Sequence, residues 1–385
     1  MRRFYEKGEM AKERRGGDRK SQKFEEKRKA VQTFIESFKA EESHYCRTDV
    51  CSTCLLLDEN IKKETNAEIK NKLIIEKRVH RLRFKAFYEI LREQRSDLLT
   101  MSFDCQKNLG LPKVPDQSAY YSRQYNFYNF TIVVGSSKAK LTKDNIFSYV
   151  WNETSHNKGN NAIISAVHHF LTNLEFKEEI KVLRIVADGC SGQNKNTGML
   201  AMLGKWLTIE AARHVKKVEI IFPVVGHSFI PPDRIFAQIE KDLKKREVIS
   251  SPEQYQEIIT QYCKLTPLDT IAVQDWKSAY APIIKPTTSW HLQFQKCKRP
   301  LQKKSITMVI PDVIPANQII PNKAKVTDVS NLLKKHYGEQ WKDIETLAFY
   351  KTIEARRSEQ EDLEEISEIS NDLCENGFDD VNLIV

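Results

Sequence analysis

The sequence contains no apolar run of about 18 residues, the length that a membrane-spanning helix requires, so we expect no membrane partner. Its first residues are charged rather than apolar, which predicts an intracellular protein without a secretory signal peptide. The 8 cysteines are scattered and include one close pair, so a disulfide scaffold is not expected. The sequence also lacks internal repeats.

Positive charge is in excess, and it is unevenly distributed. The formal net charge is +9, yet residues 353–385 hold 11 acids and 2 bases, a net −9, which leaves +18 on residues 1–352. A basic body favours nucleic acid as the partner, here DNA, and the acidic tail 353–385 is predicted to be disordered. The basic arm 1–40 either contacts DNA and directs the protein to the nucleus, or is a disordered charged leader.

A short segment rich in cysteine and histidine follows the arm and begins a predicted helical region over residues 41–96. His44, Cys46, Cys51 and Cys54 are ligands of the kind that bind tetrahedral zinc, and the Cys51/Cys54 spacing is a common chelating one. Reduced, unligated cysteines are the alternative. Residues 55–95 lack glycine and proline and predict one long helix. We interpret this helix as a spacer packed on the main domain. The alternative is that it joins two copies of the chain in a homodimer.

The pattern of apolar residues predicts an α/β domain over residues 97–300, followed by a small C-terminal extension over 301–352. Three strands, a helix, a strand, a helix, a strand and a helix are expected in that order over residues 98–104, 125–134, 145–151, 160–174, 182–187, 197–213, 218–225 and 232–246. This is the element order of the ribonuclease H fold. It implies a mixed sheet, with a three-strand antiparallel meander and two parallel strands, flanked by helices.

Three aspartates occupy related places in this order. Asp104 ends the first strand, Asp188 follows the fourth, and Asp233 opens the helix after the fifth, so we expect them to converge where hard metal ions bind. The alternative is that Asp188 caps a turn and Asp233 complements a helix dipole. Glu240 is the other candidate for the third acid, about 10 Å further along the helix axis. Glu153 is a fourth acid or a turn residue.

Five segments carry a resemblance to a known family: SFDCQKNLGLPKVP, YYSRQYNFYNFTI, YVWNET, DGCSGQNKN and GHSFIPPDRIFAQIEK. They resemble a family of transposon-derived proteins, abundant in arthropods, with an uncharacterised ribonuclease H-like domain. The resemblance covers about residues 30–300 and includes the upstream ESHYCR and CxxC segments. Two departures are visible: Gly189 stands where the family usually has asparagine, and ESHYCR nearly abuts CxxC.

The resemblance implies a transposase-like nuclease or strand transferase acting on DNA. Asp104, Asp188 and Asp233 would hold two Mg²⁺ or Mn²⁺ ions for an in-line phosphodiester displacement. His227 and Gln193 could orient the attacking water or the phosphate, although a structural role for His227 at a strand end is the stronger expectation. Arg234, Lys195 and Asn194 would contact phosphates, with Lys195 equally well a solvated residue.

Two other functions compete with this one. A domesticated DNA-binding or scaffold protein would keep the fold and the three aspartates without cleaving DNA. A phosphate-loop NTPase is disfavoured, because GCSGQNKNT does not meet the spacing G-x-x-x-x-G-K-[ST].

Overall fold

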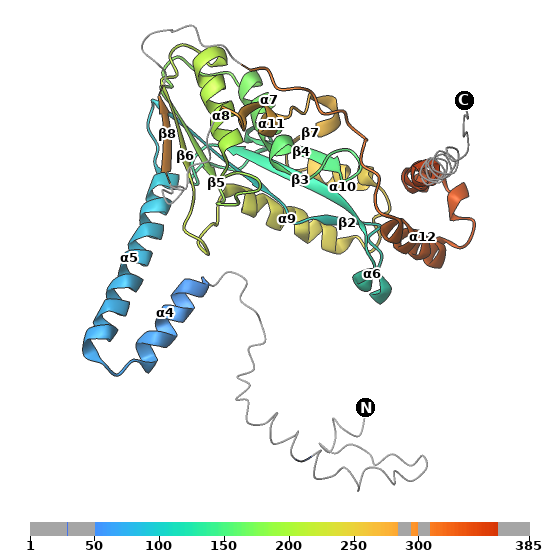
Figure 1. Ribbon diagram of the computed structural model, residues 1–385, viewed down its shortest axis with the longest axis horizontal. Helices are drawn as coiled ribbons and strands as arrows, with labels where there is room; N and C mark the ends of the chain where they lie inside the picture. Colours follow the sequence, from blue (N-terminus) through green and yellow to red (C-terminus); the bar gives the residue numbers. More distant parts are fainter. Residues whose placement is uncertain (1–28, 30–50, 284–293, 299–308, 361–385) are drawn as a thin grey trace, which may run out of the picture. The chain divides into compact units, whose positions relative to one another are not determined.

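The computed structural model describes residue 29 and residues 51–283, 294–298 and 309–360 (Figure 1). From Cys51 onward the chain forms one contact unit, so the helices that follow the cysteines belong to the same unit as the sheet. Within the described residues, every helix is too short or too polar to cross a membrane. The expected basic arm lies outside the described residues, apart from Lys29.

One mixed β-sheet forms the centre of this unit. Its strands are β1 (Leu98–Cys105), β2 (Leu109–Leu111), β3 (Tyr125–Val134), β4 (Ile146–Asn152), β5 (Val182–Ala187), β6 (Lys217–Ile221), β7 (Lys264–Pro267) and β8 (Phe294–Lys298). They lie in the order β7-β4-β3-β1-β5-β6-β8, and β2 pairs with β3. β1, β3 and β4 form an antiparallel meander, while β5 and β6 continue the sheet parallel to β1. The α/β class and the mixed sheet with flanking helices are therefore confirmed.

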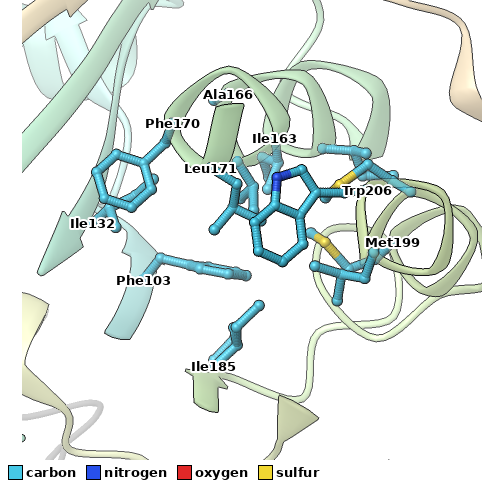
Figure 2. Packing of buried hydrophobic residues seen from close by; sticks show 14 of the residues in the cluster. Phe103, Ile132, Ile163, Ala166, Phe170, Leu171, Ile185, Met199 and Trp206 are labelled. Atoms are coloured by element: carbon cyan, nitrogen blue, oxygen red, sulfur yellow. The ribbon is translucent and has the colours of Figure 1, made fainter. Parts of the chain in front are cut away.

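Helices cover both faces of the sheet (Figure 1). One face is covered by α7 (Asn160–Asn173), α8 (Thr197–Lys205) and α11 (Trp276–Tyr280). Alternate residues of the strands point into this layer, which is the period that a strand requires. Figure 2 shows Trp206, which is 1% exposed, between Leu171 of α7 and Met199 of α8, with Phe103 of β1 below it.

The opposite face carries α9 (Pro231–Lys245), α10 (Pro252–Thr260) and α12 (Lys323–Tyr337). The segment expected as a separate C-terminal extension contributes to this second core, because Trp341 and Tyr350 are buried there beside Tyr125 of β3. Residues 348–360 are helical and Ile353 is buried. This helix therefore continues past residue 353, where we expected the acidic tail to begin. Residues 361–385 lie outside the described residues.

The single helix expected over residues 55–95 was a wrong prediction. The structure has α4 (Ser52–Lys63) and α5 (Ala67–Arg92), separated at Asn66. The Asn66 side chain accepts hydrogen bonds from the backbone N–H groups of Glu68 and Ile69, which starts a new helix without glycine or proline. An ion pair between Lys77 and Asp58 joins the two helices.

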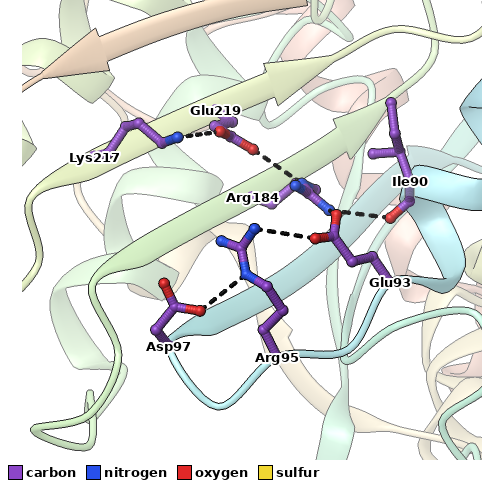
Figure 3. A network of polar contacts seen from close by, with 7 residues as sticks. All are labelled: Ile90, Glu93, Arg95, Asp97, Arg184, Lys217 and Glu219. Atoms are coloured by element: carbon purple, nitrogen blue, oxygen red, sulfur yellow. Dashed lines mark hydrogen bonds and ion pairs between the residues drawn. The ribbon is translucent and has the colours of Figure 1, made fainter.

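The end of α5 is fastened to β5 and β6 by a buried charge network (Figure 3). The Arg184 guanidinium donates to Glu219 at 3.0 Å, to Glu93 at 2.6 Å and to the backbone carbonyl of Ile90 at 3.1 Å. Lys217 pairs with Glu219 at 2.5 Å. Because Arg184 and Glu219 are both nearly inaccessible, their charges depend on these ion pairs for compensation. Apolar contacts of Phe87 and Leu91 complete this junction.

Two expected elements are shorter than predicted. α8 ends at Lys205 and continues as a π-helical turn, η2 (Trp206–Glu210), instead of reaching residue 213. β6 ends at Ile221 rather than at residue 225, because Pro223 has no N–H group for a ladder. Residues 222–230 form a loop that leads into α9.

Candidate functional site

Asp104 is the penultimate residue of β1, and Asp188 directly follows β5, the neighbouring parallel strand. The register of β1 and β5 pairs Phe103 with Ala187, so the two aspartates are the next residues on each strand path. Phe103 and Ala187 point into the α7/α8 core, and by alternation the aspartates point to the other face, where α9 lies. The predicted placement of both carboxylates at one edge of the sheet follows from this register.

The third aspartate comes from the first turn of α9. This helix begins with Pro231 and Pro232 and packs against β1 and β3 through Ile235 and Ile239. The Asp233 carboxylate accepts a hydrogen bond from the backbone N–H of Ile230 at 2.8 Å. Asp233 thus lies in the first turn of α9, where the alternative interpretation expected it to complement the helix dipole, and it is also close enough to Asp104 and Asp188 for their charges to interact.

Electrostatics shows that the three carboxylates are close enough to interact. Burial raises the pKa of Asp104 to about 7, and the negative charges of Asp188 and Asp233 add to this effect. Burial also raises the pKa of Asp233, with a further contribution from Asp188. Among the described residues, no lysine or arginine forms an ion pair with any of the three. The three carboxylates thus gather negative charge without an ion-paired lysine or arginine, and the charge of Lys158 offsets only part of the rise in the pKa of Asp104.

The three carboxylates are not as tightly clustered as the ligands of one ion. Of the described residues, one group alone brings three or more ligand atoms of His, Cys, Asp or Glu within 4.8 Å of one another, and the aspartates do not belong to it. Asn194 stabilises Asp188 by donating its side-chain amide to the carboxylate. The buried amide oxygen of Asn194 has no hydrogen-bond partner.

The other two acids considered from the sequence are engaged elsewhere. Glu240 pairs with Lys107 at 3.1 Å and accepts a hydrogen bond from Gln106 at 3.1 Å. Glu153 pairs with Lys325 at 2.7 Å and accepts from Asn126. Their charges are compensated, which favours Asp233 as the third acid.

The residues expected to contact phosphate are spread over two places. Asn194 lies beside Asp188, as described, and Gln193 is in the same turn, which the Cys190 carbonyl closes. Lys195 extends over the Phe222 ring at 5.4 Å. Arg234 donates to the carbonyl of Ser137 at 3.1 Å and lines a separate cavity.

This cavity, of about 430 Å³, lies next to Asp233 on the α5/α9 side of the sheet. Three basic side chains, Arg92, Lys138 and Arg234, contribute to its wall together with Phe229. Tyr88 also lines it, and burial followed by the charge of Asp233 raises the pKa of this tyrosine. The cavity is therefore a basic recess, and its lining residue Tyr88 is close enough to Asp233 to be affected by that charge.

The one group of described residues whose ligand atoms all lie within 4.8 Å of one another consists of Cys51, Cys54, His80 and His227. It lies where α4, α5 and the loop after β6 meet, and it could hold a metal such as zinc. The two cysteines are half of the expected zinc set; the other half, His44 and Cys46, lies outside the described residues.

The two histidines were not expected in this role. His227 stands in the cysteine cluster, its Nε2 3.5 Å from Cys54 Sγ and 3.2 Å from His80 Nε2. Burial and the nearby His80 lower the pKa of His227, which favours the neutral ring. His80 belongs to no local sequence motif. The feature that could have predicted its role is its position on the same face of α5 as Phe84, Phe87 and Leu91.

Comparisons with known proteins add one similarity. A family model described as a domain of unknown function, DUF7869, matches residues 131–310. The matched span contains Asp188, His227 and Asp233, whereas Asp104 and the two cysteines precede it. No curated protein matches the chain. These findings attach no activity to the similarity.

Proposed function

We propose that this chain is a transposase-like protein whose ribonuclease H-like domain cleaves or joins DNA phosphodiesters with the help of divalent metal ions. Asp104, Asp188 and Asp233 are the proposed ligands. The observation that carries the proposal is the convergence of three carboxylates on one sheet edge, where no basic side chain among the described residues forms an ion pair with them. Burial first, and the charge of Asp188 second, raise the pKa of Asp104 to about 7.

The sheet supports the fold assignment. Strands β4, β3 and β1 form the antiparallel meander, and β5 and β6 lie parallel to β1 on its other side. This order and these directions are those expected from the ribonuclease H-like element order. The first and fourth strands of the expected order, which are β1 and β5 of the structure, are neighbours, as the proposed mechanism requires.

The donor set suits Mg²⁺ or Mn²⁺. Three carboxylates are hard oxygen ligands, and a divalent cation would relieve both their mutual repulsion and the cost of burying them. Two ions about 3.5–4 Å apart need a wider set of ligands than one ion does, in keeping with carboxylates that do not all lie within 4.8 Å. When bound, such ions would lower the pKa of an attacking water and stabilise the leaving oxygen.

The protein's own residues have separate tasks in this proposal. Asn194 holds the Asp188 carboxylate in place, and the backbone of Ile230 does the same for Asp233. The surrounding strands keep Asp104 partly buried, which limits the access of water to the site. Lys158 is close enough to Asp104 to lower its pKa, against the larger effect of burial. It is a further candidate for contact with a phosphate.

The charge distribution supports DNA as the substrate. Residues 1–352 carry a net +18, and Arg92, Lys138 and Arg234 line the cavity beside Asp233. Basic side chains of this kind position a nucleic acid by its phosphates rather than by its sequence. A basic N-terminal arm and a DNA substrate together favour a nuclear or nucleocytoplasmic location, and a homodimer remains part of the proposal.

A second candidate is a DNA-binding protein that has kept this fold without catalysis. One observation favours it: the three carboxylates are less closely gathered than the four Cys and His ligands, so metal binding could be weak. The two candidates share DNA binding and differ only in metal-dependent cleavage.

A nicking assay separates the candidates. Purified protein is incubated with supercoiled plasmid and Mn²⁺, beside Asp188→Asn and the matched control Asp242→Asn. The Asp242 carboxyl lies in the last turns of α9 and pairs with Lys245. We expect nicking by the wild type and the control, a loss of about 10²-fold or more in Asp188→Asn, and unchanged DNA binding in all three. DNA binding without nicking by the wild type would favour the second candidate, and the absence of binding would refute both.

A further inference from the structure

The geometry points to a structural zinc site formed by Cys51, Cys54, His80 and His227, which fastens the helix pair α4/α5 to the loop between β6 and α9. This inference goes beyond the proposed nuclease function and does not depend on it, because none of the four residues belongs to the aspartate cluster.

The distances among the four ligand atoms fit one tetrahedral zinc ion. With Zn–S of about 2.3 Å and Zn–N of about 2.05 Å, a tetrahedron places sulfur and nitrogen about 3.6 Å apart and two nitrogens about 3.4 Å apart. The observed separations are 3.4 Å for Cys51 Sγ to His80 Nε2 and 3.5 Å for Cys54 Sγ to His227 Nε2. The two Nε2 atoms are 3.2 Å apart. All four atoms lie within 4.8 Å of one another.

Hydrogen bonds alone do not account for this arrangement. A neutral imidazole nitrogen offers either one N–H group or one lone pair. His227 Nε2 nevertheless lies near both Cys54 Sγ and His80 Nε2, and His80 Nε2 lies near both His227 Nε2 and Cys51 Sγ. One nitrogen cannot satisfy two such partners, whereas a central cation satisfies all four atoms at once. Two sulfurs and two nitrogens are a set that selects zinc, and four protein ligands close the site, as in structural zinc centres.

The sequence on both sides of the site allows the loop after β6 to approach the start of α4 closely. Cys51 is the N-cap of α4 and Cys54 lies in its first turn, so both thiols are at the same helix end. Gly226 has φ +80°, and a side chain there would lie 2.9 Å from the Cα and Sγ atoms of Cys51. Only glycine lets the loop pass so close to the cysteine. Phe84 stacks on the His227 ring at 4.2 Å and orients it.

The position of the site gives it a mechanical role. His227 lies in the loop that leads from β6 to α9, three residues before Ile230, which packs on Phe87 and Leu91 of α5. Asp233 follows in the first turn of α9. A zinc ion would therefore anchor the loop to α5 just before the helix that presents Asp233. Ordering of this helix start is the predicted consequence of zinc binding.

The composition of the site can be tested on the full chain. We expect about one zinc per chain by elemental analysis, and X-ray absorption with two sulfur neighbours at about 2.3 Å and two nitrogen neighbours at about 2.0–2.1 Å. His80→Asn and His227→Asn should retain less than about a tenth of the zinc, because loss of one ligand opens the closed site. The matched control Cys190→Ser, at an exposed cysteine, should retain all of it.

The same measurements distinguish this ligand set from the one expected from sequence. His44→Asn and Cys46→Ser should keep their zinc, and three sulfur neighbours in the wild-type spectrum would instead assign Cys46 to the site and overturn the proposal. Zinc-free wild-type protein after expression in zinc-supplemented medium, and after attempted reconstitution, would overturn it as well.

The anchoring role is tested by hydrogen exchange on wild-type protein before and after removal of zinc with a chelator. Exchange should accelerate in peptides covering residues 51–57 and 222–236, and it should stay unchanged in α7, which packs on the opposite face of the sheet. Equal exchange at 222–236 in both states would refute the anchoring role. These readouts involve no DNA cleavage, so their failure is independent of the nuclease proposal.

Discussion

Replacing Asp104 by asparagine should stabilise the protein in the absence of divalent metal. The pKa of this carboxyl rises from 3.8 to about 7 in the folded state, through burial first and the charge of Asp188 second. A raised pKa means that the folded state binds the proton more tightly than the unfolded state does. Folding is therefore penalised increasingly as the pH rises from about 4 to about 7, where the unfolded chain is ionised and the folded site resists ionisation.

The size of the penalty follows from the same values. At 1.36 kcal/mol per pKa unit, the cost at pH 8 has an upper bound of about 4 kcal/mol. Asparagine has the shape of the protonated acid and keeps an oxygen for the N–H of Cys105, which now donates to Asp104 at 2.7 Å. Because the surroundings relax, we expect a gain of about 1–3 kcal/mol, seen as a rise in melting temperature of about 2–5 °C.

The assay compares thermal unfolding of wild type, Asp104→Asn and Asp242→Asn at pH 5 and pH 8 with a metal chelator present. The gain of Asp104→Asn should be larger at pH 8. Asp242→Asn should show no gain, because hydrogen bonds from Lys245 and Tyr262 lower the pKa of that carboxyl. Added Mg²⁺ should then stabilise the wild type and leave Asp104→Asn unchanged. A variant that is less stable than wild type at pH 8, or equally affected at both pH values, would refute the electrostatic account of this site.

Three further predictions concern other parts of the molecule. Arg184→Met should lower the free energy of unfolding by about 3–5 kcal/mol in denaturant titration, because it leaves the buried charge of Glu219 without its main ion-pair partner. Adding Glu219→Leu to this variant should recover much of the lost stability. A further loss in the double variant would count against this explanation. Gly226→Ala should destabilise by at least about 1–3 kcal/mol and reduce zinc content, whereas Gly189→Ala, with no atom within 4 Å of the added carbon, should change neither. Deleting residues 361–385 removes nine acids and no base, so non-specific DNA affinity should increase and stay strongly salt-dependent at an unchanged melting temperature, and unchanged affinity would mean that the tail does not compete with DNA.

The strands of the sheet were the most predictable part of the fold. The bounds of β3 and β5 match the expected ranges, because each is a run dominated by aromatic, β-branched and other apolar residues, with few polar ones. β6 was predicted too long, since the apolar run continues past Ile221, although Pro223 within that run already indicated that the ladder with β5 would end before it. β7 and β8 were not predicted, because short edge strands depend on the partner strand more than on their own composition.

The aspartates were predictable for a reason that the cysteine site does not share. Residues that follow parallel strands are gathered at one sheet edge by topology alone, so the element order suffices to bring Asp104 and Asp188 together. Which acid on α9 faces them required the structure, because Asp233 and Glu240 share a helix face. The ion pair of Glu240 with Lys107 could not be predicted from the pattern of apolar residues.

The cluster of Cys51, Cys54, His80 and His227 marks the limit of sequence reasoning in this chain. A spacing of two residues between cysteines is a local signal, and it was sufficient to select that pair. Its histidine partners are distant in the sequence: His80 lies on the second helix of the α4/α5 hairpin, and His227 follows β6. His44, only seven residues before Cys51, was the nearer candidate. The information that favours His80 lies in the helix itself: it begins a stripe that continues through Phe84, Phe87 and Leu91, the last two of which are buried. A histidine that heads an apolar stripe lies at the buried face of its helix, where it needs a polar partner, and in this structure that partner is the cysteine pair beside His227.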